Sequence, residues 1–442
     1  MAGREAAPRR CDRGPMADEG LMTLALAADA GTGGDRSPRR RHRAVLALCA
    51  LNFFMADVQA GIGPFLGVFL QRHGWQTGPI GSVMTAGGIA GMLAAIPAGA
   101  FIDHTRRKRL VVIVTGLCTV LASFLLLLSQ SAIVVTLSQL ATAVAGAAIG
   151  PAMAGMTLGI VRQKGFNAQM GRNQAWNHAG NMAGAGLSGW FGWRFGLPAI
   201  FFLSAAFGVL AIASVLAVPE TSIDHRAARG LEDGTDHDSG TRAEGLRAFL
   251  HHKPLLVLAV CLCCFHLGNA AMLPLYGMAV VSAGKGDPAM FTATTVVVAQ
   301  AVMIVVSLLA MRLAARRGYW IVLLVSFAAL PLRGVLAGSF IQHWGVWPVQ
   351  MLDGIGAGLQ SVAVPGLVAR LLRGTGRVNV GLGMVMTAQG VGAGLSPALG
   401  GWLAEALGYS SAFYTLGCIA VPSLLLWIGF GATVRAASRN AA

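Results

Sequence analysis

The stretch Gly99-Ala-Phe-Ile-Asp103-His-Thr-Arg106-Arg107-Lys108-Arg109 joins two long apolar segments through one carboxylate and a run of basic residues. Charged residues are scarce in this chain, at 12% of its 442 residues. The acid follows a glycine by four residues and stands at the end of one membrane-length segment, directly before the next. This placement indicates a specialised junction between two helices.

The composition indicates a membrane protein. Apolar residues make up 55% of the chain and the mean hydropathy is +0.64, whereas soluble domains average about 25% charged residues. The formal net charge of +15 would indicate nucleic-acid binding in a soluble protein, but in membrane proteins Lys and Arg collect in cytoplasmic loops. We therefore predict a polytopic membrane protein with the lipid bilayer, and no nucleic acid, as its partner.

Six of the seven cysteines lie inside apolar segments, and the remaining one, Cys11, lies near the N-terminus. The cluster Cys261-Leu-Cys263-Cys264 has a spacing that scatters the sulfurs around a helix axis, which favours helix packing over a metal site. We expect no metal and no cofactor.

A membrane-spanning helix needs about 20 largely apolar residues. Twelve such segments can be drawn, over residues 44–70, 78–102, 109–128, 132–161, 168–191, 196–218, 254–281, 290–314, 319–342, 346–371, 378–407 and 411–433. The separation of the fifth segment from the sixth is the least distinct. The predicted fold class is an all-α membrane protein with twelve transmembrane helices.

Basic residues set the orientation of these segments. Clusters at 39–43, 106–109, 162–164, 312–317, 370–377 and 435 all fall on one side, and the other side has few basic residues beyond Arg72, Arg194 and Lys285. The positive-inside rule therefore predicts that both termini are cytoplasmic, with the chain in the inner (plasma) membrane.

Composition also divides the chain into regions. Residues 1–43 are rich in Arg, Gly and Ala without apolar periodicity, which predicts a disordered cytoplasmic tail. Two six-helix bundles, 44–218 and 254–434, are joined by a polar cytoplasmic linker over 219–253. The Asp and His residues at 233–238 can contact a metal ion, but a solvated linker explains them better.

The two bundles repeat each other in sequence. Gly184-Ala-Gly-Leu-Ser188 recurs 208 residues later as Gly392-Ala-Gly-Leu-Ser396. The glycine pair at 146 and 150 recurs at 354 and 358 with the same offset, and Pro64 is followed by Pro274 at an offset of 210. Such an internal repeat is typical of carriers that work by alternating access.

The 99–109 block resembles the loop between the second and third helices of the major facilitator superfamily, a large class of secondary transporters. The family pattern is Gly-x-x-x-Asp-(Arg/Lys)-x-Gly-(Arg/Lys)-(Arg/Lys), which Gly99, Asp103, Arg107 and Lys108 match. His104 and Arg106 replace a basic residue and the second glycine. With the repeat, the resemblance extends over about residues 44–434 and implies two pseudo-symmetric bundles around a central cavity in a monomeric carrier.

Ionisable side chains at membrane depth are costly, so each is a functional candidate. Asp57 lies in the first segment and His266 lies in the seventh, near the position that the repeat pairs with Asp57. The resemblance implies that the two face each other across the substrate path. A desolvated carboxyl group holds its proton more tightly than in water, and an imidazole titrates near neutrality, so such a pair suggests proton coupling; the alternative is that both are hydrogen-bonded packing groups.

The fifth segment carries a polar stripe. Steps of four place Asn173, Asn177 and Asn181 on one face, and Gln174 and His178 widen it. Such a face cannot contact lipid, so it lines a cavity or joins helices, and we favour the cavity. Further cavity candidates are Asn52, Gln59, Asn269 and Gln389.

Arg333 in the ninth segment and Asp353 in the tenth are predicted at similar depths of adjacent helices. An ion pair is the usual way in which buried charges are tolerated, so we favour a structural bridge. The alternative is that Arg333 binds an anionic substrate.

The resemblance assigns the 99–109 block to a cytoplasmic gate in which Asp103 and Arg107 stabilise the outward-facing form. Arg106 in place of glycine alters the turn. The matching stretch of the second half, Leu313 to Arg317, keeps basic residues but has no acid. Thr142 stands where the family carries a helix-4 arginine, and the fifth segment lacks the Gly-Pro-x-x-Gly-Gly motif of many proton antiporters.

These features together predict a secondary active transporter of a small organic solute, coupled to protons, and not an enzyme. Efflux of a drug or metabolite is slightly favoured over proton-coupled uptake of an organic anion or other polar nutrient. A non-transporting receptor or a lipid-acting enzyme is a remote alternative, because no phosphate-binding loop, nucleophile–base set or output domain is present in the sequence.

Overall fold

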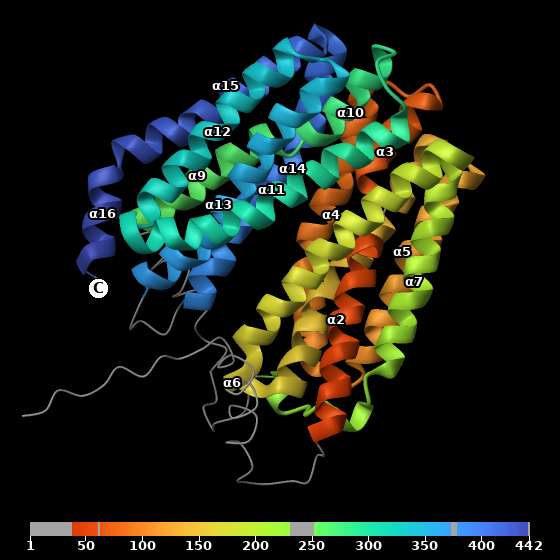
Figure 1. Ribbon diagram of the computed structural model, residues 1–442, viewed down its shortest axis with the longest axis vertical. Helices are drawn as coiled ribbons and strands as arrows, with labels where there is room; N and C mark the ends of the chain where they lie inside the picture. The colour runs from red at the N-terminus through yellow and green to blue at the C-terminus, as the bar shows by residue number, and fades with distance from the viewer. Residues whose placement is uncertain (1–37, 61, 230–251, 373–377, 441–442) are drawn as a thin grey trace, which may run out of the picture.

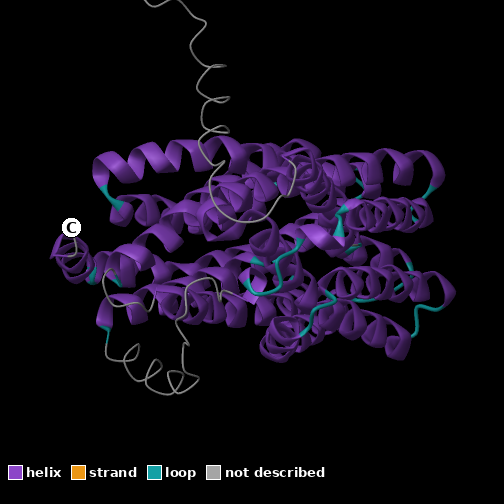
Figure 2. Cartoon of the chain, turned by 90° about the horizontal axis from the view of Figure 1, so that it is seen from below, coloured by secondary structure: helices purple, strands orange, loops and turns teal. Residues whose placement is uncertain are grey.

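The computed structural model describes residues 38–60, 62–229, 252–372 and 378–440. These residues form α-helices, short 3-10 turns and loops, with no strand among them (Figures 1 and 2). The first half contains α2 (Pro38–Ala60), α3 (Gly63–Arg72), α4 (Thr77–His104), α5 (Lys108–Leu128), α6 (Ala132–Phe195) and α7 (Pro198–Ala217). The second half contains α9 (Lys253–Asn269), α10 (Met272–Ser282), α11 (Pro288–Arg317), α12 (Tyr319–Ser339), α13 (Val346–Leu371), α14 (Val378–Leu407), α15 (Tyr409–Gly429) and α16 (Gly431–Asn440).

The long helix α6 is two antiparallel helices that meet at Arg162. This residue has φ 58° and ψ 177°, which is not helical. The Asn173 Nδ2 donates a hydrogen bond to the Thr157 Oγ1, at 3.0 Å, so the chain folds back on itself. We call residues 132–161 the first limb of α6 and residues 163–195 the second limb. They correspond to the predicted fourth and fifth segments.

Two of the predicted spans are broken in the middle. The first consists of α2 and α3, and the seventh consists of α9 and α10. Pro64 lies in the first turn of α3 and Pro274 lies in the first turn of α10. Proline has no N–H and its ring clashes with the carbonyl four residues earlier, so each proline favours a break just before it. The two prolines of the sequence repeat therefore mark equivalent breaks.

Ten segments of the described chain are long and apolar enough to cross a membrane. The two predicted spans outside this set are the second limb of α6 and α14, which are the segments that carry the repeated Gly-Ala-Gly-Leu-Ser motif. Of the predicted tail, residues 1–37 lie outside the described chain, and residues 38–43 belong to α2. Of the predicted linker, residues 230–251 also lie outside it, and 220–222 and 227–229 form 3-10 turns.

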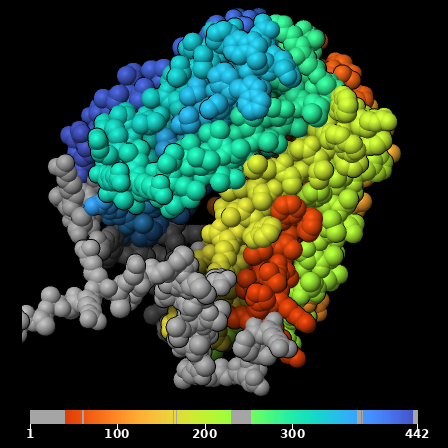
Figure 3. Space-filling view, in the orientation of Figure 1, coloured from red at the N-terminus to blue at the C-terminus, as the bar shows by residue number. Residues whose placement is uncertain are grey.

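The two halves meet at one end of the molecule and part at the other (Figure 1). We call the end that carries α3 and α10 the far end, and the end where α2 begins the terminal end. At the far end α4 packs on α14 and the second limb of α6 packs on α11. Toward the terminal end the space-filling view shows a hollow between the halves (Figure 3).

The buried apolar side chains follow the same division. One cluster joins far-end residues of the first half, such as Phe69 and Phe201, with residues of the second half, such as Met272 and Phe291. The other cluster lies wholly in the first half, around Met55 and Met156. The hydrophobic core is therefore continuous between the halves at the far end.

Glycines allow the close approach at the far end. A Cβ on Gly81 of α4 would collide with the carbonyl of Pro397 in α14, and a Cβ on Gly189 of α6 would collide with Ala293 of α11. Small residues at such positions let helix backbones approach in a membrane. The two halves thus form a tight seal at this end.

Candidate functional site

The second limb of α6 has separate faces toward α2, toward α11 and toward the outside of the protein. Gly180 lies against the carbonyl of Phe53 in α2, and Gly189 and Gly192 lie against Ala293 and Ala289 of α11. A third face is apolar and exposed, with Trp176, Leu187, Trp190 and Trp193. With 100° per residue, Asn177 points between the α2 and α11 faces, Gln174 and Asn181 point nearly in the direction of Gly192 on the α11 face, and all three point away from the exposed apolar face. This orientation directs the polar stripe toward the space between the halves.

The equivalent helix of the second half, α14, has the same arrangement. Gly392 lies against the carbonyl of Cys263 in α9, whereas Gly394 and Gly401 lie against α4. Gln389 falls between these two faces by helical geometry, and it is the repeat counterpart of Asn181. Two amide side chains therefore occupy pseudo-symmetric positions on α6 and α14.

Other members of the polar stripe make contacts within the protein. Asn173 is only 3% exposed and bonds to Thr157, so it joins the two limbs of α6. The His178 Nδ1 contacts the Gln300 Oε1 of α11 at 2.9 Å, which links the two halves. Asn181 donates to Asn177 at 3.2 Å. For Asn173, the alternative role of joining helices describes its surroundings better than a cavity does.

The two amides of α2 differ in exposure. Asn52 is buried and donates to the carbonyl of Leu48 in its own helix, at 2.8 Å. Gln59 is exposed, near the break between α2 and α3. Gln59 is therefore the better placed of the two to contact a solute.

Asp57 is buried between α2 and the second limb of α6. Its side chain is packed against Gly184, where a Cβ would collide with the carboxylate. Its residue exposure is 7%, and none of the described residues forms a hydrogen bond or ion pair with it. A buried carboxyl group without a partner is an uncommon arrangement, because desolvating a polar group is costly.

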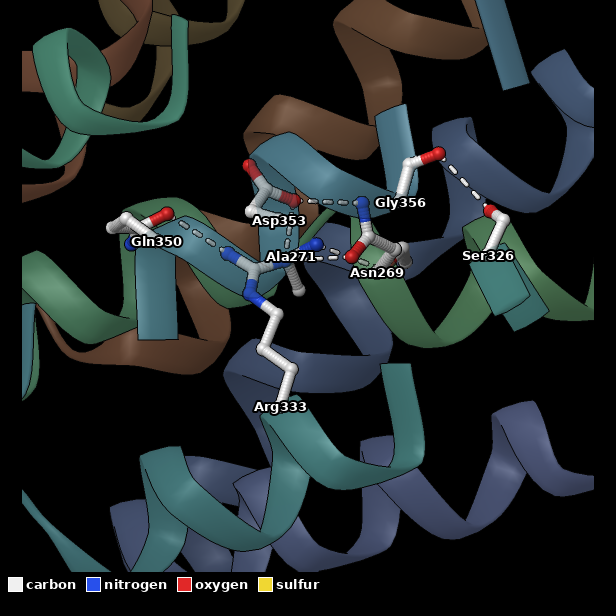
Figure 4. A network of polar contacts seen from close by, with 8 residues as sticks. Asn269, Ala271, Ser326, Arg333, Gln350, Asp353 and Gly356 are labelled. Atoms are coloured by element: carbon white, nitrogen blue, oxygen red, sulfur yellow. Dashed lines mark hydrogen bonds and ion pairs between the residues drawn. The ribbon is translucent and has the colours of Figure 1, made fainter. Parts of the chain in front are cut away.

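His266 lies in the other half and does not contact Asp57. Its Nε2 is 3.1 Å from the Gln360 Oε1, and Gln360 donates to the hydroxyl of Ser326 at 3.0 Å. The Ser326 hydroxyl in turn donates to the carbonyl of Gly356 (Figure 4). His266 is thus held in a chain of hydrogen bonds across α9, α13 and α12.

Arg333 and Asp353 form an ion pair, with 2.7 Å between the Nη1 and the Oδ1. Arg333 also donates to the amide oxygens of Asn269, at 2.6 Å, and Gln350, at 3.2 Å, and Asn269 donates to Asp353 at 3.3 Å (Figure 4). The Arg333 side chain is 1% exposed and that of Asp353 is 14% exposed. Asn269 is the last residue of α9, so this network ties α12 and α13 to the break before α10.

The break between α9 and α10 has a further polar contact. The backbone N–H of Ala271 donates to the hydroxyl of Ser396 in α14, at 2.9 Å (Figure 4 draws Ala271). A broken helix leaves backbone donors without intrahelical partners, and Ser396 satisfies one of them. Ser396 is the last residue of the repeated motif, which explains why the sequence carries a hydroxyl there.

The gating-loop candidates fall into two groups. Asp103 and Arg107 are exposed, and a Cβ on Gly99 would meet open space. Lys108 is 2% exposed, and its Nζ donates to the carbonyls of Ile102, at 2.7 Å, and Thr105, at 3.0 Å. A cation at the C-terminal carbonyls of a helix is favourable, so Lys108 fixes the end of α4 to the start of α5.

Polar contacts across the far-end seal were not predicted from the sequence. The Ala398 N–H donates to the Thr85 hydroxyl, at 2.9 Å, and the Trp402 Nε1 donates to the Ser82 hydroxyl, also at 2.9 Å. The glycines of 78–91 and 390–401 are the signal that could have indicated this interface. Within the described residues there is no group of three or more His, Cys, Asp or Glu side chains suited to a metal ion.

Comparison with known proteins gives the family. A sequence model described as the Major Facilitator Superfamily matches residues 47–379. The chain belongs to the major facilitator superfamily. The family implied by the 99–109 block is thereby confirmed, and with it a multi-pass membrane protein that acts as a secondary transporter.

Relatives and solved structures agree with this assignment. The chain is 35% identical over 389 residues to the MFS-type transporters Rv2456c and MT2531 of two Mycobacterium tuberculosis strains, covering 87% of this chain and 92% of each relative. A crystal structure of a point mutant of the nucleoside transporter NupG superposes with a TM-score of 0.72 at 15% identity, over 87% of this chain and 99% of NupG. A bacterial homologue of the human lysosomal transporter Spinster superposes with a TM-score of 0.65 at 15% identity, over 91% of this chain and 98% of that one. At these identities the superpositions show the fold.

Proposed function

We propose that this transporter moves a small polar or amphipathic organic solute by alternating access, coupled to protons, with efflux as the net direction. The observation that carries the proposal is the contrast between the two ends. The halves are sealed at the far end and parted at the terminal end, and the amide-bearing faces of α6 and α14 point toward the parted space.

The proposed orientation places both termini in the cytoplasm and the chain in the inner membrane. The loops at the terminal end contain the basic clusters around Arg106 and Arg316, and such loops face the cytoplasm in membrane proteins. In this orientation the hollow is open to the cytoplasm, so a solute could load from inside the cell.

The side chains around the hollow favour a solute that is bound through hydrogen bonds. Gln174, Asn177, Asn181 and Gln389 offer amide donors and acceptors on its walls. Arg333 is 1% exposed and its guanidinium is already bound to Asp353, Asn269 and Gln350. An anion would have to displace these partners, so uptake of an organic anion through Arg333 has less support than transport of a neutral polar solute.

Asp57 is the proposed proton site. It is a carboxyl group without a protein partner among the described residues, at the break of the first span, and it is packed against the helix that carries the polar stripe. A change in how α2 and α6 pack would change its exposure and hence its proton affinity. His266 is a weaker candidate, because Gln360 already binds its ring.

The site can be tested by substitution of the two symmetric amides. A panel of neutral and anionic solutes would first be screened by thermal shift on the purified protein, and the best ligand would then be assayed in proteoliposomes. Asn181→Ala and Gln389→Ala should each raise the KM about five- to tenfold, since each removes one net hydrogen bond of about 1 kcal/mol.

Asn173→Ala is the matched control, because this amide contacts Thr157 instead of the hollow. It should lower thermal stability and leave the KM of the folded protein unchanged. The site proposal fails if Asn181→Ala and Gln389→Ala leave the KM at the wild-type value, or if Asn173→Ala raises it as much as they do. A preferred ligand from the anionic part of the panel would count against a neutral solute.

A further inference from the structure

The N-termini of α4 and α11 lie at the far end and belong to corresponding helices of the two halves, yet they are capped differently. The first N–H groups of a helix have no partner within the helix, and a side-chain acceptor usually satisfies them. In α11 that acceptor is local. Asp287 is the N-cap residue, and its carboxylate accepts from the N–H groups of Ala289, at 3.0 Å, and Met290, at 2.9 Å.

In α4 the acceptor comes from the other half. The N-cap residue, Gln76, makes no side-chain cap, and Pro79 has no N–H. The N–H of Gly78 donates to the Oε2 of Glu405, at 2.8 Å. Glu405 lies two residues before the end of α14, so a carboxylate of the second half caps a helix of the first half.

The local sequence is suited to this contact. A Cβ on Gly78 would lie 2.7 Å from the Glu405 Oε2 and 2.7 Å from the ring of Trp402. Any side chain at this position would therefore force the Glu405 carboxylate and the Trp402 ring to move, which disturbs the contact between α4 and α14. Trp402 adds a second polar link, from its indole N–H to the hydroxyl of Ser82.

We propose that Glu405 is a latch that holds the far end closed by capping the N-terminus of α4. This rests on the proposed alternating access, in which α14 must leave α4 when the far end opens. On opening, α4 would lose its cap, whereas α11 would keep its cap because Asp287 belongs to the same half. Closure of the far end is thus linked to the Glu405 carboxylate. Only α4 depends on the other half for its cap, since α11 is capped from within its own half.

The latch can be measured without knowing the solute. Spin labels would be placed on cysteines at Ala132 and Ala283, two exposed alanines near the far end of each half, in the full chain without its native cysteines and reconstituted in nanodiscs. Distance distributions from double electron–electron resonance report closed and open far ends as short and long populations. Glu405→Ala should lower the ratio of short to long by roughly two- to thirtyfold, the range implied by losing one helix cap.

Further variants separate the charge of Glu405 from the packing at Gly78. Glu405→Gln keeps an acceptor without the charge and should shift the ratio less than Glu405→Ala. Gly78→Ala should shift it in the same direction through the steric clash, and it gives a reading even where Glu405→Ala is too unstable. Gly63→Ala is its control, because a Cβ there meets open space.

Asp287→Ala is the control for capping itself, because it removes a cap of the same chemistry within one half. It should reduce thermal stability and leave the distance ratio unchanged. The latch is excluded if Glu405→Ala and Gly78→Ala leave the ratio at the wild-type value, or if Asp287→Ala shifts it equally. A single short population in every variant would exclude the latch and count against alternating access as well, whereas two populations that Glu405 does not affect would exclude the latch alone.

Discussion

Two aspartates inside the spans, Asp57 in the first half and Asp353 in the second, have opposite surroundings. Asp353 accepts hydrogen bonds from Arg333 and Asn269, in a network that joins three helices. Asp57 lies against Gly184 and has no polar partner among the described residues. The first arrangement fixes a charge in place, and the second leaves a carboxyl group free to gain or lose a proton.

We propose from this difference that the two halves divide structural and coupling roles. A paired buried charge contributes to the fold, since removing either partner leaves the other uncompensated. An unpaired buried acid contributes little to the fold and is retained for another reason, such as proton transfer. Substitutions at the ion pair should therefore cost the most stability, and substitutions at Asp57 should cost the least.

The largest effect is expected at the ion pair. Arg333→Gln leaves Asp353 without its cation and should destabilise the protein by about 3–5 kcal/mol, the usual result of breaking a buried pair. Thermal unfolding of the detergent-solubilised protein, followed by tryptophan fluorescence or by aggregation, measures this. The yield of folded protein should fall with it.

The double variant Arg333→Gln, Asp353→Asn is the control for this prediction. Replacing both charges by neutral amides removes the uncompensated carboxylate, so the double variant should be more stable than Arg333→Gln alone. Equal damage in the single and double variants would contradict a structural role of the pair. If Arg333→Gln abolished transport without lowering stability, this result would instead support a role for Arg333 in substrate binding.

The contrast between these aspartates also shows what the sequence could and could not predict. Hydropathy, basic loops and the 208-residue repeat were enough to predict the helical fold in two halves, because each depends on composition or spacing along the chain, and the resemblance of the 99–109 block implied the family. The proximity of Arg333 to Asp353 followed from counting residues along two adjacent helices. All of these features depend only on the order and spacing of residues along the chain.

The contacts of the candidate site depend on helix rotation, which the sequence fixes only loosely. The spacing of four placed Asn173 and Asn181 on one stripe, but Asn173 bonds to Thr157 on the other limb of α6, whereas Asn181 bonds to Asn177 in its own limb. The cap on α4 from Glu405 was not predictable, since it joins residues 327 positions apart in two halves. Similarly, the 99–109 block drew attention to Asp103, whereas Lys108 makes the buried contacts there.

An intermediate effect is expected at the glycine that faces Asp57. Gly184→Ala places a Cβ where the Asp57 carboxylate lies and should cost about 1–3 kcal/mol through overpacking. Gly186→Ala is the matched control, because Gly186 is exposed on the same helix and a Cβ there meets nothing. It should raise stability slightly, since alanine is the better helix former. If both variants unfold at the same temperature, Asp57 is not packed against α6 in the membrane-extracted protein.

The smallest effect on stability is expected at Asp57 itself. Asp57→Asn keeps the shape of the side chain and breaks no hydrogen bond or ion pair among the described residues, so the unfolding free energy should change by no more than about 1 kcal/mol. Asparagine cannot carry the proton, however. In proteoliposomes, transport driven by an imposed pH gradient should be abolished while exchange of solute across the membrane continues.

The paired Asp353 provides the comparison. Asp353→Asn should lower stability, and any decrease in its pH-driven transport should match the loss of folded protein. If Asp57→Asn transports solute at the wild-type rate under a pH gradient, the division of roles between the two aspartates is wrong, and the hydrogen-bonded His266 becomes the next proton site to test.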